Sequence, residues 1–394
     1  MSSLATFLEV AAAVLLAPTL VGTLYLAVLT FAGSLPARRR SSAALPGRLA
    51  IVVPAHNEAT GIRRTIDNLL AIARTDGNAE VVVVADNCSD ETAAIARSAG
   101  ARVMERHDAT RRGKGYALDH AFTALAGEDH VAYIVIDADS IASPGLLAGV
   151  RRHFGDGALA LQARYTVLNG DAAPRTRLAG IALAAFNVLR PRGRDRLGLS
   201  AGILGNGFAL RRDVLQRVPY TASSVVEDLE YHLRLVAADI RVAFADDCEV
   251  RGEMPTGEQG SRVQRARWEG GRLRMLAEHG PALAGAVLRG QGRFLEPLAD
   301  LLLLPLAYHA MLLLAATALL APLASPLAIV AGASLGIVVL HTLVAMRVAG
   351  LPWSRLWSLA RVPLYLLWKL RMLATTLAGA ARGSAWIRTD RSGS

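Results

Sequence analysis

Two aspartates, Asp137 and Asp139, end an apolar run in the segment YIVIDADS, residues 133–140. Side chains two positions apart on an extended chain point the same way, so these carboxylates can converge. Two carboxylates at close range repel each other unless a cation lies beside them. Mg²⁺ and Mn²⁺ prefer such hard oxygen ligands and are often shared with substrate phosphates. The pair therefore predicts a metal site, and the metal would stabilise charge on a departing diphosphate.

Other polar residues follow predicted strands in the same way. Asp86 comes directly after the predicted strand 80–85, and Pro54 to Glu58 follow the predicted strand 49–53. Each residue alone is compatible with ordinary turn or helix-cap chemistry. In a parallel sheet, however, ligands bind beyond the carboxyl ends of the strands. Because these groups share that edge with the aspartate pair, the pattern favours a binding site.

The segment from about residue 49 to 250 alternates short β-branched runs with helical stretches. This alternation predicts an α/β fold, and strands that are apolar throughout predict a mainly parallel sheet with helices on both faces. The predicted strands cover 49–53, 80–85, 101–105 and 132–136, and the predicted helices cover 61–73, a stretch from about 91, and 115–126.

Apolar runs outside this segment predict membrane helices. The chain has 394 residues, of which 53% are hydrophobic and 19% charged. Residues 10–35 carry no charged side chain, which is enough for one span. Residues 301–346 are too long for one span and contain Pro322 and Pro326, so we expect two. The fold class is thus α/β with added transmembrane and interfacial helices.

The basic cluster Arg38–Arg40 follows the first apolar run rather than preceding it, which favours a retained anchor over a cleaved signal peptide. The positive-inside rule then places the following segment in the cytoplasm. We expect an integral protein of a bacterial-type cytoplasmic membrane. Residues 362–381 are compatible with a fourth span, although an interfacial helix is favoured. The expected parts are an anchor at 1–36, a catalytic domain at 48–255, interfacial helices at 256–298, two membrane helices at 299–347 and a cytoplasmic or interfacial segment at 348–394.

The net charge of +10 is typical of cytoplasmic loops in membrane proteins. No run interleaves aromatic residues with Lys or Arg, so nucleic acid is not expected as a partner. Membrane lipids and a phosphate-bearing substrate are expected instead. The G-x-S-x-G pattern at 198–202 has no predicted strand before it, which disfavours a hydrolase.

Five motifs in order resemble the family 2 glycosyltransferases. The resemblance is closest to membrane-embedded members such as the synthases of cellulose, hyaluronan and poly-N-acetylglucosamine, the chitin-oligosaccharide synthases and ceramide glucosyltransferase. It covers about residues 50–270 and implies a GT-A-type, Rossmann-like fold. The motifs are PAHNEA (54–59), ADNCSDET (85–92), DAD (137–139), ED (227–228) and QRARW (264–268).

The resemblance implies a donor site for a nucleotide-sugar, here a UDP-sugar. Asp86 would bind the uracil or ribose end, and Pro54 and Glu58 would line that pocket. Lys114, in the segment RGKGYAL, would approach the nucleotide or its diphosphate.

The resemblance also implies the catalytic groups. Asp137 and Asp139 would hold Mg²⁺ or Mn²⁺ on the diphosphate, with Asp139 the more direct ligand. Asp228, preceded by Glu227, would be the general base that takes the proton from the acceptor hydroxyl. Direct in-line attack would invert the anomeric carbon.

The last motif would serve both substrates. Gln264 and Arg267 would contact the donor, where the guanidinium fork of Arg267 matches a diphosphate. Trp268 offers an apolar face for an acceptor sugar or lipid-borne group. A small-residue loop below the acceptor would comprise Gly205, Asn206 and Gly207.

Three functions remain open at this point. The enzyme would extend a polysaccharide or another cell-envelope glycan, or it would add a single sugar to a lipid or polyprenyl-linked acceptor. A non-enzymatic nucleotide sensor would use Asp86 and the aspartate pair but would have no use for Asp228. The transferred sugar, the acceptor and the oligomeric state are left open.

Overall fold

The computed structural model describes residues 3–36, 43–221, 224 and 226–381, and these residues form two compact units. The first, here called the helical unit, comprises residues 3–35, 177–197 and 262–381. The second, the sheet unit, comprises the other described residues. The predicted catalytic domain at 48–255 thus contains an insert, 177–197, whose contacts are with the helical unit.

The sheet unit is built on one mixed sheet of eight strands in the order β3-β2-β1-β4-β7-β6-β8-β5. The first four strands of that order run parallel, as do β6 and β8, whereas β7 is antiparallel to both of its neighbours and β5 is antiparallel to β8. The strands are β1 (Arg48–Ala55), β2 (Ala79–Asp86), β3 (Arg102–Arg106), β4 (His130–Val135), β5 (Ser140–Ala142), β6 (Ala160–Val167), β7 (Phe208–Arg211) and β8 (Val242–Gly252).

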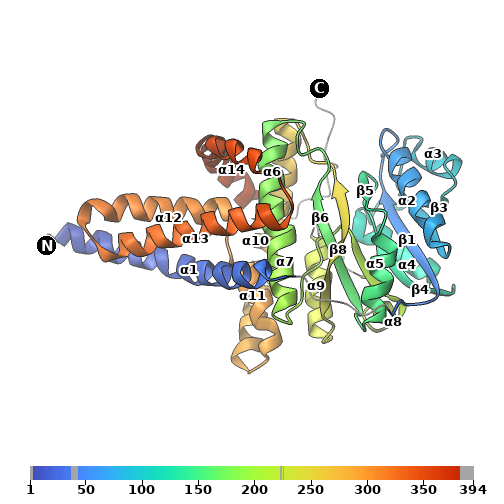
Figure 1. Ribbon diagram of the computed structural model, residues 1–394, viewed down its shortest axis with the longest axis horizontal. Helices are drawn as coiled ribbons and strands as arrows, with labels where there is room; N and C mark the ends of the chain where they lie inside the picture. Colours follow the sequence, from blue (N-terminus) through green and yellow to red (C-terminus); the bar gives the residue numbers. More distant parts are fainter. Residues whose placement is uncertain (1–2, 37–42, 222–223, 225, 382–394) are drawn as a thin grey trace. The chain divides into compact units, whose positions relative to one another are not determined.

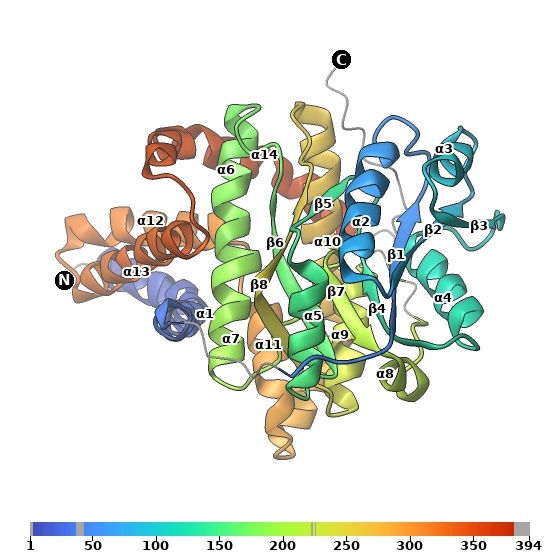
Figure 2. The ribbon, with the colours of Figure 1, turned by 45° about the vertical axis from the view of Figure 1, so that its right-hand side comes forward.

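Helices cover both faces of this sheet (Figure 2). Strand β1 shows why, because its residues are buried on both sides. Leu49, Ile51 and Val53 belong to a core with α2, α3 and α5. Ala50 and Val52 belong to the opposite core with α4, α8 and α9. The helices are α2 (Ile62–Asp76), α3 (Thr92–Ser98), α4 (Lys114–Leu125), α5 (Leu146–Gly155), α8 (Arg212–Arg217) and α9 (Glu227–Ala237).

The predicted fold class, a mainly parallel sheet between helices, is confirmed. The four predicted strands correspond to β1 to β4 and the three predicted helices to α2 to α4, with ends that differ by one to three residues. The second half of the sheet was not predicted. There the chain enters β7 from the glycine loop, which comprises Gly205, Asn206 and Gly207, and β7 pairs antiparallel with β4. This pairing makes the sheet mixed.

Three helices of the helical unit have the length and composition to cross a membrane, and they cover Glu9–Ser34, Leu306–Leu323 and Pro326–Val348. They lie side by side in Figures 1 and 2. The basic cluster Arg38–Arg40, which carries the orientation prediction, lies outside the described residues. The elements of this unit are α1 (Ser3–Ser34), α6 (Pro174–Leu183), a π-helix (Ala184–Leu189), α7 (Arg190–Arg196), α10 (Glu258–Leu288), α11 (Leu295–Leu302), α12 (Leu306–Leu320), α13 (Pro326–Val348) and α14 (Val362–Ala381), with 3-10 turns at Gly292–Phe294, Ala321–Leu323 and Trp353–Arg361.

The insert 177–197 joins the helical unit through a close helix contact. A Cβ atom added at Gly193 of α7 would lie 2.5 Å from the carbonyl oxygen of Leu29 in α1. The two backbones therefore approach at a distance that only glycine permits. Arg190 and Arg194 of α7 also form buried ion pairs with Asp300 of α11.

Candidate active site

Asp137 and Asp139 lie in a tight turn between β4 and β5. The Ser140 N–H donates to the Asp137 carbonyl at 3.1 Å, which closes the turn. Ala138, between the two aspartates, is buried, and its carbonyl accepts a hydrogen bond from the Thr65 hydroxyl of α2 at 2.8 Å. The turn thus has a fixed inner side and two carboxylates of the kind that bind Mg²⁺ or Mn²⁺. This donor set fits the predicted metal.

Lys114 brings a positive charge to the same place. It is the first residue of α4, and its ammonium group forms an ion pair with Asp137 and donates to the Gly205 carbonyl. Burial alone would lower the pKa of Lys114, but the carboxylates of Asp137, Glu227 and Asp228 outweigh it and raise the pKa. Lys114 is therefore charged and links the turn to the glycine loop.

Asp228 lies beside the same loop. It is the second residue of α9, and its Oδ1 accepts a hydrogen bond from the Leu229 N–H at 2.8 Å. A Cβ atom at Gly205 would come within 3.1 Å of Asp228 Oδ2. Burial raises the pKa of the Asp228 carboxyl, and the nearby Lys114 opposes this shift. A carboxylate with a raised pKa is a better proton acceptor, as a general base requires.

The glycine loop before β7 is held in a conformation that suits glycine. Gly205 and Gly207 have φ angles of +76° and +72°, which other residues rarely adopt. The Gly207 N–H donates to the Val135 carbonyl of β4 at 2.9 Å, so the loop is fixed beside the strand that leads to Asp137. The predicted acceptor role of this loop stays a prediction.

Asp86, the last residue of β2, is 4% exposed and held by a neighbour that the sequence analysis missed. Its Oδ1 accepts hydrogen bonds from Arg106 Nη1 at 2.6 Å and from the Asn87 side chain at 3.0 Å. Arg106 ends β3, the next strand along the sheet edge. Its signal in the sequence is its position, because Arg106 directly follows the third predicted strand, 101–105.

The loops after β1 and β2 are connected to each other. Pro54 lies near the end of β1, and Glu58 follows in the loop, where its N–H donates to the Thr92 hydroxyl of α3 at 2.8 Å. His56 Nδ1 lies 2.7 Å from the Asp86 carbonyl oxygen. The structure therefore brings the predicted donor residues Pro54, Glu58 and Asp86 to one edge of the sheet.

We expect Arg106→Met to lower the free energy of unfolding by about 3 kcal/mol, because it leaves the buried Asp86 carboxylate without its ion-pair partner. Arg97→Met is the matched control, since Arg97 pairs with Glu105 on the surface and such pairs contribute about 1 kcal/mol or less. Thermal unfolding in detergent, followed by circular dichroism, measures both. Equal melting temperatures for the two variants would contradict the expectation.

The predicted residues Gln264, Arg267 and Trp268 lie on α10, in the part that belongs to the helical unit. Within that unit, the next residue, Glu269, forms an ion pair with the buried Lys369 of α14. This pair fixes the motif-bearing turn of α10 against α14. The roles of the motif in donor and acceptor binding stay predictions.

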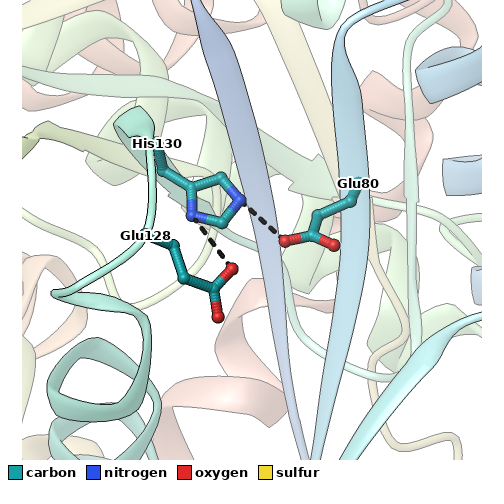
Figure 3. Close-up of side chains that lie close together, drawn as sticks. All are labelled: Glu80, Glu128 and His130. Carbon is teal, nitrogen blue, oxygen red and sulfur yellow. Dashed lines mark ion pairs between the residues drawn. The ribbon is translucent and has the colours of Figure 1, made fainter.

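Among the described residues, three other side chains have metal-ligand spacing, and they lie at the start of the strands, which is the opposite end of the sheet. Glu80, Glu128 and His130 each offer an atom within 4.8 Å of the others, and the buried His130 ring lies between the two carboxylates (Figure 3). Arg48 pairs with Glu80 at 2.9 Å, and Arg102 pairs with Glu128 at 2.7 Å. Because two guanidinium groups already balance these carboxylates, the group fits a charge network better than a metal site.

The G-x-S-x-G segment is no nucleophile elbow, because helix α7 precedes it and no strand does. Its Ser200 hydroxyl oxygen accepts from the Val242 N–H at 3.1 Å and lies 2.9 Å from His232 Nε2. These contacts tie the loop to β8 and α9.

Residues 46–271 match the model of a protein family described as "Glycosyltransferase like family 2". Among curated proteins, "Probable glycosyltransferase YdaM" of Bacillus subtilis is 26% identical over 64% of this chain and 62% of its own length. "Glycosyltransferase AglD" of Haloferax volcanii is 31% identical over 59% of this chain and 39% of its own length. "Beta-monoglucosyldiacylglycerol synthase" of Trichormus variabilis is 29% identical over 58% of this chain and 50% of its own length. The chain thus covers less than two thirds of each of these relatives.

One solved structure is similar over nearly the whole chain. The mannosyltransferase PcManGT from Pyrobaculum calidifontis, in complex with GDP-Man and Mn²⁺, has a TM-score of 0.57 at 18% identity. The match covers 95% of this chain and 98% of that one. At this level of identity the likeness shows a shared fold.

Proposed function

We propose, on the premise that this chain belongs to the glycosyltransferase like family 2, that it transfers a sugar from a UDP-sugar to a hydroxyl group at the cytoplasmic face of a membrane. The chain is a family 2 nucleotide-sugar transferase, and the non-enzymatic sensor is set aside on that ground. The identity of the donor, the acceptor and the membrane location belong to the proposal.

The observation that carries the proposal is that four charged side chains lie at one edge of the sheet, namely those of Lys114, Asp137, Asp139 and Asp228. Lys114 pairs with Asp137, and Asp228 lies against the glycine loop to which Lys114 donates. Asp139 is in the same turn as Asp137. Strand ends of this kind bind ligands in α/β sheets, and this set combines metal ligands, a cation and a base.

The chemistry follows from these groups. Asp137 and Asp139 would hold Mg²⁺ or Mn²⁺, which when bound supplies positive charge to the leaving diphosphate. Lys114 supplies a further positive charge beside the turn. Asp228 accepts the proton of the acceptor hydroxyl while the oxygen of that hydroxyl bonds to the anomeric carbon. The bond from that carbon to the diphosphate oxygen breaks, and its electron pair leaves with the diphosphate, so the configuration inverts.

The helical unit supports a membrane location. Three of its described helices are long and apolar enough to cross a bilayer. In the segment after them, Trp353 and Trp357 are exposed, as are Leu364 and Leu367 of α14. Exposed tryptophans and leucines are typical of a headgroup boundary, and they support membrane lipids as partners and an interfacial position for α14.

Two acceptors fit this proposal. The resemblance to polysaccharide synthases favours a growing cell-envelope glycan. The similarity to a protein named beta-monoglucosyldiacylglycerol synthase favours a single addition to a lipid acceptor. Product length distinguishes them, because a polymerising enzyme yields a ladder of products and a single-addition enzyme yields one species.

We expect purified membranes that contain this protein to release UDP from one member of a panel of UDP-sugars, and only with Mg²⁺ or Mn²⁺ present. GDP-mannose is included because the similar PcManGT structure contains GDP-Man. Release is measured by a coupled nucleotide assay, and products from a labelled donor are sized by chromatography. Release from GDP-mannose alone would overturn the UDP assignment, and release without a divalent metal would overturn the metal site.

A further inference from the structure

A buried side chain, Asn206, connects the glycine loop to the aspartate turn. Asn206 is 1% exposed, and its Oδ1 accepts a hydrogen bond from the Asp137 N–H at 3.1 Å. Its Nδ2 donates to the Ser140 hydroxyl at 2.8 Å, and that hydroxyl donates to Asp139 Oδ1 at 3.1 Å. One amide therefore reaches the backbone of one metal-ligand residue and, through Ser140, the carboxylate of the other.

The direction of these bonds is determined by chemistry. A backbone N–H only donates, so the oxygen of the Asn206 amide must face Asp137. The nitrogen then faces Ser140, whose single hydroxyl hydrogen is left for Asp139. In this arrangement both ends of the Asn206 amide form hydrogen bonds within the protein. The side chain is also buried, which leaves little of it exposed for the acceptor contact that the resemblance implied.

The position of Asn206 is itself fixed by the fully buried Gln162 of β6. Gln162 Nε2 donates to the Asn206 carbonyl and its Oε1 accepts from the Leu204 N–H, both at 2.8 Å. On the other side of the loop, the Gly207 N–H donates to Val135 at 2.9 Å. A residue with this many backbone restraints is suited to hold another group in place.

We infer that Asn206 is a positioning residue that, with Ser140, sets the orientation of Asp137 and Asp139 for the divalent metal. This inference rests on the proposed metal role of the two aspartates. Removing such outer partners typically weakens metal binding 10- to 100-fold. We therefore expect Asn206→Ala to bind Mn²⁺ at least about 10-fold more weakly than the wild-type protein.

Asn68→Ala is the matched control. The Asn68 side chain also forms two hydrogen bonds with backbone of the strand that follows the turn, donating to the Ala142 carbonyl at 3.2 Å and accepting from the Ala142 N–H at 2.9 Å. Within the described residues, the Asn68 side chain forms no hydrogen bond with Asp137, Asp139 or Ser140. Asn68→Ala should lower thermal stability without changing Mn²⁺ affinity.

The experiment titrates full-length protein in detergent with Mn²⁺ and measures free Mn²⁺ by electron paramagnetic resonance, with thermal unfolding in parallel. Ser140→Ala, a smaller change that folds if Asn206→Ala does not, should also weaken binding. The double variant should bind no more weakly than Asn206→Ala alone, because both residues act on Asp139 through one connection. At saturating Mn²⁺ the kcat of Asn206→Ala should recover, whereas the Mn²⁺ concentration for half-maximal rate stays raised.

Wild-type affinity in both Asn206→Ala and Ser140→Ala would overturn the positioning role alone. A fall in Mn²⁺ affinity of the same size in Asn68→Ala would also overturn it, because the effect would then be a general loss of structure. Failure of the wild-type protein to bind Mn²⁺ would overturn the metal role of the aspartates together with this inference.

Discussion

Asp228→Asn should abolish most sugar transfer while leaving donor binding intact. We expect kcat to fall by about 10²- to 10⁴-fold, the usual effect of losing a general base. Asparagine keeps the size of the side chain and can still accept the Leu229 N–H bond, but it cannot take up a proton. Initial rates with a labelled donor, together with UDP affinity from calorimetry, measure the two effects separately.

The pH dependence of the wild-type rate gives a second measurement of the same residue. Burial raises the pKa of the Asp228 carboxyl above its usual range. A base must be deprotonated to act, so the rate should fall as the pH drops through this raised pKa and level off above it. The residual rate of Asp228→Asn should not show this acidic limb.

Glu230→Gln is the matched control for this variant, since Glu230 lies in the first turn of the same helix. Its carboxylate accepts a hydrogen bond from the Ser224 N–H at 3.1 Å. A comparable fall in kcat in Glu230→Gln, or full activity in Asp228→Asn, would show that Asp228 is not the base.

The parallel half of the fold was predictable because its signals are local. The apolar runs that form β1, β2 and β4 have buried side chains on both faces. Their composition is therefore enough to distinguish them from half-exposed strands, in which apolar and polar residues alternate. The acidic residues that follow these strands indicate the ligand-binding edge, because ligands of parallel sheets bind beyond the carboxyl ends of the strands. This is why Asp86 and Asp137 were found without knowledge of the strand order.

The rest of the site depends on contacts between distant segments, for which the sequence has no local signal. Asn206 lies in a loop that resembles any glycine turn, and its bonds to Asp137 and Ser140 require β7 to run antiparallel beside β4. The apolar stretch of the insert 177–197, residues 178–189, is too short to span a membrane and so does not indicate which unit it joins. Its contact with α1 depends on Gly193 matching the Leu29 backbone.

Asp139→Asn should show which of two candidate groups in the sheet unit binds the metal, the Asp137–Asp139 turn or the group of Glu80, Glu128 and His130. We expect it to lose Mn²⁺ binding and to lower kcat/KM by about 10³-fold, since a metal contributes several kcal/mol to stabilising the leaving diphosphate. The Ser140 hydroxyl that donates to Asp139 remains, so the turn itself should stay folded.

Glu128→Gln is the control for Asp139→Asn, because Glu128 belongs to the network of Glu80 and His130 at the far end of the strands. It should keep wild-type Mn²⁺ affinity and lose only some stability, because its ion pair with Arg102 is partly exposed. If Glu128→Gln loses Mn²⁺ binding and Asp139→Asn keeps it, the metal binds at the group of Glu80, Glu128 and His130. The Asp137–Asp139 turn would then contribute to the reaction only through its ion pair with Lys114.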